Sequence, residues 1–125
     1  MDDLERREQG MKIRREILGD AHVDRATESA NEFSAPFQDL ITRYAWGEVW
    51  SRPGLSRHTR SLLTLAMTIA LNRDEEFLLH LRGATSNGVT KDEIRELLIH
   101  SAIYCGVPAA NHAFKLASDF FASAP

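Results

Sequence analysis

Three side chains near the middle of the chain have the types and spacing to act together on an anionic substrate. Arg73, Glu76 and His80 are three and four residues apart, so a helix places them along one strip of its surface. A guanidinium can bind a carboxylate, and an imidazole can move a proton near neutral pH. Glu76 would orient the His80 ring. The spacing predicts a site that holds an acid and transfers a proton.

The same spacing also fits a purely structural arrangement. Arg73 and Glu76 can form a solvated ion pair while His80 is a core histidine with satisfied hydrogen bonds, and on spacing alone this is the commoner outcome. Phe77 and Leu81 border the strip on its apolar side. The pattern is not His-Glu-x-x-His, and the chain has one cysteine, so we expect no metal site.

A second candidate is an aromatic cluster around one carboxylate. Tyr44, Trp46 and Trp50 lie within seven residues and flank Glu48. They could wall a pocket beside that carboxylate. They could equally be core aromatics with an exposed Glu48. The residues leave both interpretations open.

A third cluster runs from Tyr104 through Cys105 to a Gly-x-Pro corner at Gly106 and Pro108. The glycine and proline predict a tight connection between two helices. Cys105 falls on the buried side of its helix, where a thiol usually packs as an inert apolar group. A lone cysteine also excludes an intrachain disulfide.

The elements that must position these residues are helices. Alternating apolar runs typical of strands are absent, and Asn87-Gly88 joins two helical patterns rather than two strands. Asp2 or Asp3 can cap the first helix and Gly19 can end it, and Gly47 with Arg52-Pro53-Gly54 ends a later helix in a turn. Capping boxes are expected at Asn72 with Glu75 and at Thr90 with Glu93. The pattern predicts an all-α single domain over 1–125 with about six helices, namely 4–18, 34–47, 59–71, 72–87, 90–105 and 108–121, with a further short helix possible at 21–31.

The helix expected over 59–71 is apolar nearly all round. Such a helix is normally buried on most sides. One small domain can hardly cover it, so the pattern favours a homo-oligomer.

Composition narrows the function classes. The chain has 125 residues, 43% apolar and 26% charged, with a net charge of −3 and a pI of about 5.9. These values disfavour a nucleic-acid partner. No run reaches the roughly 20 apolar residues that span a membrane, and the charged N-terminus lacks the apolar core of a signal peptide. We expect a cytoplasmic protein.

Several segments together resemble the γ-carboxymuconolactone decarboxylase family. The motifs lie at 46–55, 59–63, 76–84, 87–96 and 104–111, and the resemblance covers about 5–122. It implies an all-α fold shared with alkylhydroperoxidase D and a homo-oligomer, commonly a hexamer or trimer of dimers. It also implies a role in protocatechuate breakdown by the β-ketoadipate route.

The redox branch of this superfamily differs at the strip. Alkylhydroperoxidase D uses a Cys-x-x-Cys pair followed by a histidine four residues on. His80 matches that histidine, but Arg73 and Glu76 stand where the cysteines would be. Disulfide-based peroxide reduction is therefore disfavoured. A thiol-dependent reductase using Cys105, and a non-enzymatic oligomeric binding protein, stay as alternatives.

The implied substrate is an unsaturated lactone carboxylate that serves as its own electron sink, so no cofactor is expected. Loss of CO2 sends electrons through the C=C bond to the lactone carbonyl, and the resulting dienolate is protonated on carbon. His80 would deliver the proton or stabilise the oxyanion, with Glu76 orienting it. The remaining roles implied are proton transfer shared by Glu48, carboxylate binding by Arg73 and Arg82, and pocket walls from Trp46 and Tyr104.

Overall fold

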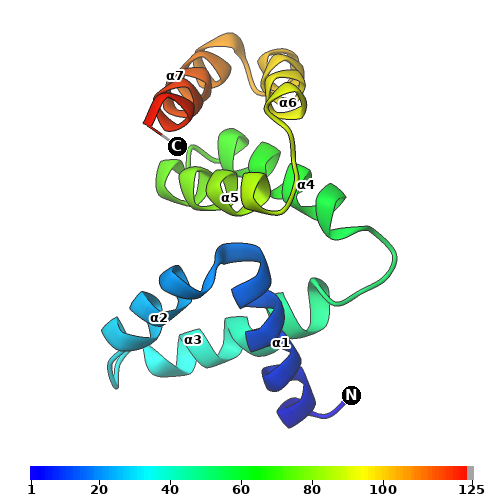
Figure 1. Ribbon diagram of the computed structural model, residues 1–125, viewed down its shortest axis with the longest axis vertical. Helices are drawn as coiled ribbons and strands as arrows, with labels where there is room; N and C mark the ends of the chain where they lie inside the picture. Colours follow the sequence, from blue (N-terminus) through cyan, green and yellow to red (C-terminus); the bar gives the residue numbers. More distant parts are fainter. Residues whose placement is uncertain (124–125) are drawn as a thin grey trace. The chain divides into compact units, whose positions relative to one another are not determined.

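Every regular element in the computed structural model is a helix, and residues 1–123 are described (Figure 1). No strand occurs among them, which confirms the all-α prediction. The elements are α1 (Asp3–Leu18), α2 (Asp20–Ser29), α3 (Ala35–Ile41), the π-helix η1 (Thr42–Val49), α4 (Arg57–Ala70), α5 (Asp74–Ser86), α6 (Lys91–Tyr104) and α7 (Val107–Ser123).

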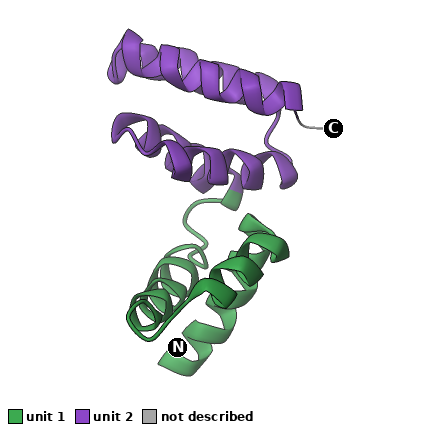
Figure 2. Ribbon diagram, turned by 90° about the vertical axis from the view of Figure 1, so that its left-hand side faces the viewer, with its two compact units in different colours: residues 1–57 green, residues 58–125 purple. Residues whose placement is uncertain are grey.

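The helices fall into two compact units, residues 1–57 and 58–125 (Figure 2). Unit 1 contains α1, α2, α3 and η1, and unit 2 contains α4 to α7 apart from the first residue of α4. A single domain over 1–125 stays a prediction. None of the described helices is long and apolar enough to cross a membrane.

Local sequence signals set several helix ends in both units. Asp2 caps α1: its Oδ1 accepts from the Glu5 N–H at 2.8 Å, and Glu5 Oε2 accepts from the Asp2 N–H at 3.3 Å. Gly19 ends α1 with φ +90, a value that favours glycine. The capping box expected at Thr90 is present at the start of α6, where Thr90 Oγ1 accepts from the Glu93 N–H at 3.1 Å. These predictions are confirmed.

In unit 1, α1 crosses η1 at two glycines that permit backbone contact. A Cβ on Gly10 would lie 2.0 Å from the Thr42 carbonyl oxygen, and one on Gly47 would lie 2.2 Å from the Arg6 carbonyl oxygen. Only hydrogen fits at such spacings. The buried apolar side chains of unit 1 are Ile13, Ile17, Leu18, Val23 and Trp46.

The expectation that Gly47 helps to end its helix is wrong. The helical path continues through Gly47 as η1 to Val49, and the turn comes at Trp50 and beyond. Gly47 is needed for close packing against α1 rather than for chain reversal. π-helical segments of this length are rare, and shorter ones often occur at functional sites.

Unit 2 is built around a continuous apolar cluster. The fully buried Phe77 and Leu81 of α5 contribute its largest side chains. α7 packs on both α5 and α6. The buried members are Leu65, Ile69, Phe77, Leu81, Ala84, Val89, Ile94, Leu98, Ala113 and Ala117.

Within the chain, α4 is buried along one face only. Ser61, Leu65 and Ile69 are buried at four-residue spacing, whereas Leu63 and Met67 are 42% and 59% exposed. The chain by itself therefore does not cover α4 on most sides, as expected for one small domain, and burial of the other sides in an oligomer stays a prediction. The opposite side of α4 presents apolar side chains outward.

The capping box expected at Asn72 is also wrong. Asn72 adopts φ +58 and α5 begins at Asp74, with Arg73 at the N-cap position and no side-chain cap. The sharp turn between α4 and α5 uses the left-handed conformation that asparagine tolerates better than most residues. Asn72 therefore serves the turn, not the cap.

Candidate functional site

The predicted strip lies on α5, beside that helix's buried face. Glu76 and His80 are one turn apart on α5, and Glu76 is exposed while His80 is partly buried. The neighbouring positions Phe77 and Leu81 anchor the helix in the core of unit 2. An acid and an imidazole thus sit at the edge of an apolar surface, as the spacing predicts.

Arg73 belongs to the turn before α5 rather than to the helix. It occupies the N-cap position with φ −102 and ψ 81, and its Nη1 donates to the Leu71 carbonyl at 3.1 Å. Its guanidinium is exposed and keeps further donors for an anion. Glu76 and His80 therefore lie in the first half of α5, and Arg73 lies in the turn that precedes the helix.

Glu76 also has a structural reason to be where it is. Asp74, Glu75 and Glu76 fill the first turn of α5, where the helix dipole favours negative charge. The position of Glu76 is therefore also accounted for by helix stability.

Arg82 does not share this strip. It lies two residues after His80 on an α-helix, so its side chain leaves α5 roughly 200° around the axis from the imidazole. It is exposed.

A histidine–carboxylate pair beside the strip was missed by sequence reasoning. His112 of α7 lies 2.8 Å from Asp74 Oδ2 through its Nε2, and both side chains are about half exposed. Asp74 follows Arg73 directly, so this pair sits at the same end of α5. The two residues are 38 positions apart in the sequence, so no local sequence pattern could have predicted their contact.

Tyr104 closes α6 and is largely exposed, at 79%. Its ring packs at a tilt on His100, with centroids 5.0 Å apart. An exposed aromatic of this kind is available to cover an apolar ligand or another protein surface. Cys105 follows as a free, partly buried thiol packed against the core.

In unit 1, Trp46 is a core residue. It is 6% exposed and stacks on Trp50, with ring centroids 5.0 Å apart and planes inclined by 30°. Of the two interpretations that the aromatic cluster left open, burial in the core describes Trp46 itself. Tyr44, by contrast, is 40% exposed and donates its hydroxyl to Asp3 Oδ1 at 3.2 Å.

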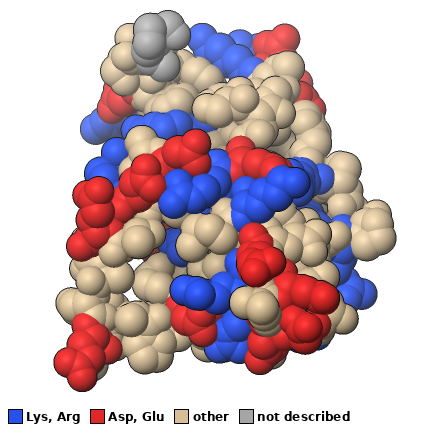
Figure 3. Space-filling model, turned by 60° about the horizontal axis from the view of Figure 1, so that its bottom comes forward, with Lys and Arg blue, Asp and Glu red and all other residues tan. Residues whose placement is uncertain are grey.

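Glu48 projects from η1 into a set of arginines. Its Oε2 lies 3.7 Å from Arg6 Nε and its Oε1 lies 3.9 Å from Arg52 Nη1. The side chain is 41% exposed. Acidic and basic side chains are interspersed in this way over the face shown in Figure 3. Glu48 is thus an accessible carboxylate held near two cations.

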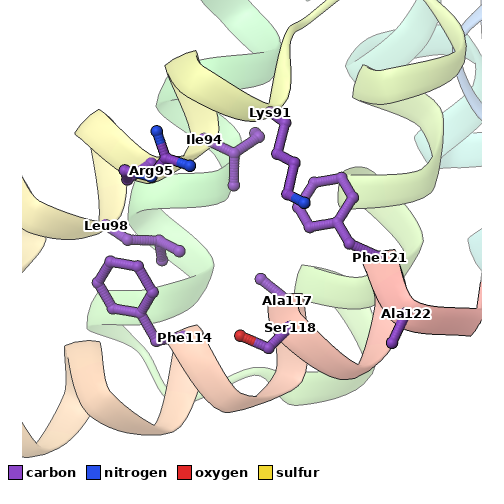
Figure 4. A pocket seen from close by; sticks show the side chains of 9 residues that line it. All are labelled: Lys91, Ile94, Arg95, Leu98, Phe114, Ala117, Ser118, Phe121 and Ala122. Carbon is purple, nitrogen blue, oxygen red and sulfur yellow. The ribbon is translucent and has the colours of Figure 1, made fainter.

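Two cavities in unit 2 lie beside α6. The first, of about 320 Å³, has an apolar floor that includes Leu98 and Phe114, with Lys91 and Arg95 at its edge (Figure 4). Lys91 Nζ lies 5.3 Å from the Phe121 ring centroid. The second, of about 600 Å³, lies between α4 and α6 and carries the acidic Asp92, Glu93 and Glu96. None of the seven candidate residues lines either cavity.

His58 and Glu93 form a second pair that sequence reasoning did not find. His58 Nε2 lies 2.6 Å from Glu93 Oε2. The backbone N–H of Thr90 and then the His58 ring lower the pKa of the Glu93 carboxyl, because both bind its charged form. This pair ties the start of α4 to the start of α6 and is structural.

Comparison with known proteins supplies the context for these side chains. A sequence model described as the carboxymuconolactone decarboxylase family matches residues 35–119. The match spans η1, with Trp46 and Glu48, and all of α4, α5 and α6. Every candidate site residue falls inside it.

Relatives match over nearly the whole chain. A protein of Acinetobacter baylyi named 4-carboxymuconolactone decarboxylase is 52% identical over 97% of this chain and 90% of its own length. A Metarhizium robertsii protein named nitrosuccinic acid decarboxylase is 49% identical over 90% of this chain and 80% of its own. A short Pseudomonas putida sequence named 4-carboxymuconolactone decarboxylase is 52% identical over 38% of this chain and matches along its full length.

Proposed function

The chain belongs to the carboxymuconolactone decarboxylase family, and on that premise we propose that it converts γ-carboxymuconolactone to β-ketoadipate enol-lactone with release of CO2. The observation that carries the proposal is the 52% identity over 97% of the chain to a relative named for this reaction. The α5 strip supports it, because it offers an anion-binding cation and a proton carrier. The step belongs to the protocatechuate branch of the β-ketoadipate pathway, in the cytoplasm.

The reaction needs charge handling more than covalent chemistry. The substrate carries two carboxylates, one of them on the ring carbon beside the ring oxygen. When that carboxylate leaves as CO2, its bonding electrons shift through the C=C bond onto the lactone carbonyl. The resulting dienolate takes one proton on the carbon α to the carbonyl. The enzyme must therefore bind a dianion, stabilise an oxyanion and deliver one proton.

The α5 strip can meet these needs. We assign the proton delivery, or donation to the oxyanion, to His80, because an imidazole exchanges protons near neutral pH. Glu76, one turn away, orients the ring. Arg73 binds the carboxylate that the product keeps, since its exposed guanidinium suits a bidentate pair.

The other four residues enter with smaller roles. Glu48 shares the proton transfer, and its accessible carboxylate lies near two arginines. Trp46 is buried, so it supports the wall of a substrate pocket indirectly, through its stacking on Trp50. Tyr104 covers the substrate with its exposed ring. Arg82 is the weakest assignment, because it leaves α5 on the side away from His80.

A homo-oligomer, either a hexamer or a trimer of dimers, completes the proposal. Its support is the apolar side of α4 that the chain leaves exposed, including Met67, together with Ile103 on α6 at 78% exposure. Scattered apolar residues are ordinary on surfaces, but a run of them along one helix is typical of an interface. Light scattering coupled to gel filtration gives the subunit number directly.

Decarboxylation of nitrosuccinic acid is the second candidate, because a relative named for it is 49% identical over 90% of the chain. The chemistry is parallel. Loss of the carboxylate beside the nitro group sends its electrons onto the nitro oxygens as a nitronate, which is then protonated on carbon. Both substrates are dicarboxylic acids that keep one carboxylate, so Arg73 and His80 could serve either.

The deciding experiment supplies each acid separately to the purified protein and follows CO2 release. The proposal predicts rapid turnover of γ-carboxymuconolactone, with nitrosuccinate slower by at least tenfold in kcat/KM. The reverse order would move the assignment to the second candidate. If the protein released CO2 from neither acid, the decarboxylase proposal would be rejected in favour of a non-enzymatic binding protein. A Cys105→Ser variant should keep full decarboxylation, and its loss of peroxide reduction alone would favour the thiol alternative.

A further inference from the structure

Arg14 of α1 is a buried cation without a carboxylate partner. Its exposure is 7%. Among the described residues its guanidinium donates to two neutral oxygens: Thr42 Oγ1 at 3.4 Å through Nη1 and Gln38 Oε1 at 3.1 Å through Nη2. Its Nε is buried and lacks an acceptor. A guanidinium has five N–H donors, so this group is under-satisfied.

Burial of such a charge normally demands compensation. Desolvation lowers the pKa of Arg14 from its ordinary value, yet arginine keeps its proton throughout the physiological range. The positive charge therefore persists, and a buried ion is costly without an opposite charge. By contrast, Arg15 and Arg43 of unit 1 reach carboxylates at 3.1 and 2.9 Å.

A cavity of about 220 Å³ lies against this guanidinium. Its lining residues come from α1, from α2 and the residue that follows it, from α3 and from the first residue of η1. Thr27, Gln38 and Thr42 contribute hydrogen-bonding groups, while Met11 and a few alanines give it apolar walls. All of its lining residues belong to unit 1.

One carboxylate, Asp39, also lines the cavity but is already neutralised. Its Oδ1 lies 3.1 Å from Arg7 Nε, and its Oδ2 accepts from Arg43 Nε at 2.9 Å. Because Asp39 is paired with two other arginines, it does not compensate the positive charge of Arg14. The cavity is thus positive overall and can accept one further negative charge.

We propose that this cavity is a binding site for a small carboxylate, held by the Arg14 guanidinium with Thr27, Gln38 and Thr42 around it. A carboxylate supplies the paired acceptors that match a guanidinium fork. The volume admits a compound of the size of acetate or succinate. The inference does not depend on the proposed decarboxylation, because binding is measured without substrate.

The test is calorimetric titration of the full-length protein with acetate and with succinate at fixed ionic strength. Acetamide and succinamide, of the same shape but uncharged, are titrated in parallel. We expect saturable binding of one of the acids, with a dissociation constant of about 1 mM or tighter. Each amide should bind at least tenfold more weakly. No saturable binding, or equal binding of acid and amide, overturns the proposal.

Matched variants locate the site. Arg14→Met should weaken acid binding at least tenfold, whereas Lys12→Met, the same charge change at an exposed position of α1, should stay within twofold. Ala30→Leu, just after α2, should fill the cavity and weaken binding likewise, whereas Ala21→Leu, at an exposed position of α2, should not. Either cavity variant that folds by circular dichroism and binds like the wild type overturns the proposal.

A measurement on the wild type covers the case in which neither cavity variant folds. Hydrogen–deuterium exchange is followed with succinate and with succinamide. Succinate should slow exchange in peptides from 7–42, which contain all the lining residues. Protection confined to other peptides, or equal protection by the amide, contradicts the site.

Discussion

The crossing of α1 over η1 makes a quantitative prediction for Gly10→Ala. The new Cβ would lie 2.0 Å from the Thr42 carbonyl oxygen, well short of the 3.4 Å at which ordinary contact begins. The obstructing atom is backbone, so no side-chain rotation relieves the clash. The helices must separate or η1 must deform.

Two opposing effects set the magnitude. Replacing glycine by alanine inside a helix favours folding by about 1 kcal/mol. Overpacking costs about 1–3 kcal/mol, and a backbone clash belongs at the upper end of that range. The net destabilisation is then about 2 kcal/mol, or a fall in Tm of roughly 8 °C at this chain length.

Gly54→Ala is the matched control, because a Cβ there would meet nothing within 4 Å. We expect its stability to stay within about 0.5 kcal/mol of the wild type. Urea unfolding followed by circular dichroism, at one protein concentration for all variants, measures both. If Gly10→Ala unfolds at the same urea concentration as Gly54→Ala, the close crossing is refuted.

Three further predictions concern unit 2. Thr90→Ala removes the cap of α6 and should cost about 1 kcal/mol in urea unfolding, and an unchanged midpoint would contradict the capping box. The folded-state pKa of Glu93 is lowered below its ordinary 4.5, so its contribution to stability is complete above that pH and is lost as pH falls through the folded value. Glu93→Gln should therefore be less stable than the wild type at pH 7, with the difference vanishing in acid; a constant difference would count against this. Phe77→Ala in the core of α5 should cost about 3–5 kcal/mol, and a loss below about 1 kcal/mol would mean that Phe77 is not packed as described.

Local signals in the sequence predicted much of the fold because they act over a few residues. The caps at Asp2 and Thr90 and the glycine at the end of α1 depend only on neighbouring backbone, and all are found. The apolar side of α5 at Phe77 and Leu81 follows from helical spacing and is likewise confirmed.

Features that depend on distant partners escaped prediction. Gly47 looks like a helix terminator in the sequence, but its lack of a side chain serves the contact with Arg6, 41 positions earlier. The contact between Asp74 and His112, and the burial of the Arg14 guanidinium among neutral oxygens, depend on which helices pack together. Spacing alone could not reveal them.

The candidate site was predictable in part. Helical spacing was enough to place Glu76 and His80 one turn apart. It misjudged Arg73, because the helix expected from residue 72 begins at Asp74, after a turn at Asn72. The roles of these residues came from the family resemblance, since side-chain chemistry on one helix is compatible with several reactions.

Turnover of γ-carboxymuconolactone by His80→Gln tests the central claim most directly. The wild type and the variant are compared for CO2 release, with His58→Gln as the control histidine from the structural pair with Glu93. If His80 delivers the proton, kcat should fall by about 10²-fold or more in His80→Gln and stay near normal in His58→Gln. Near-normal turnover by a folded His80→Gln variant would contradict the account.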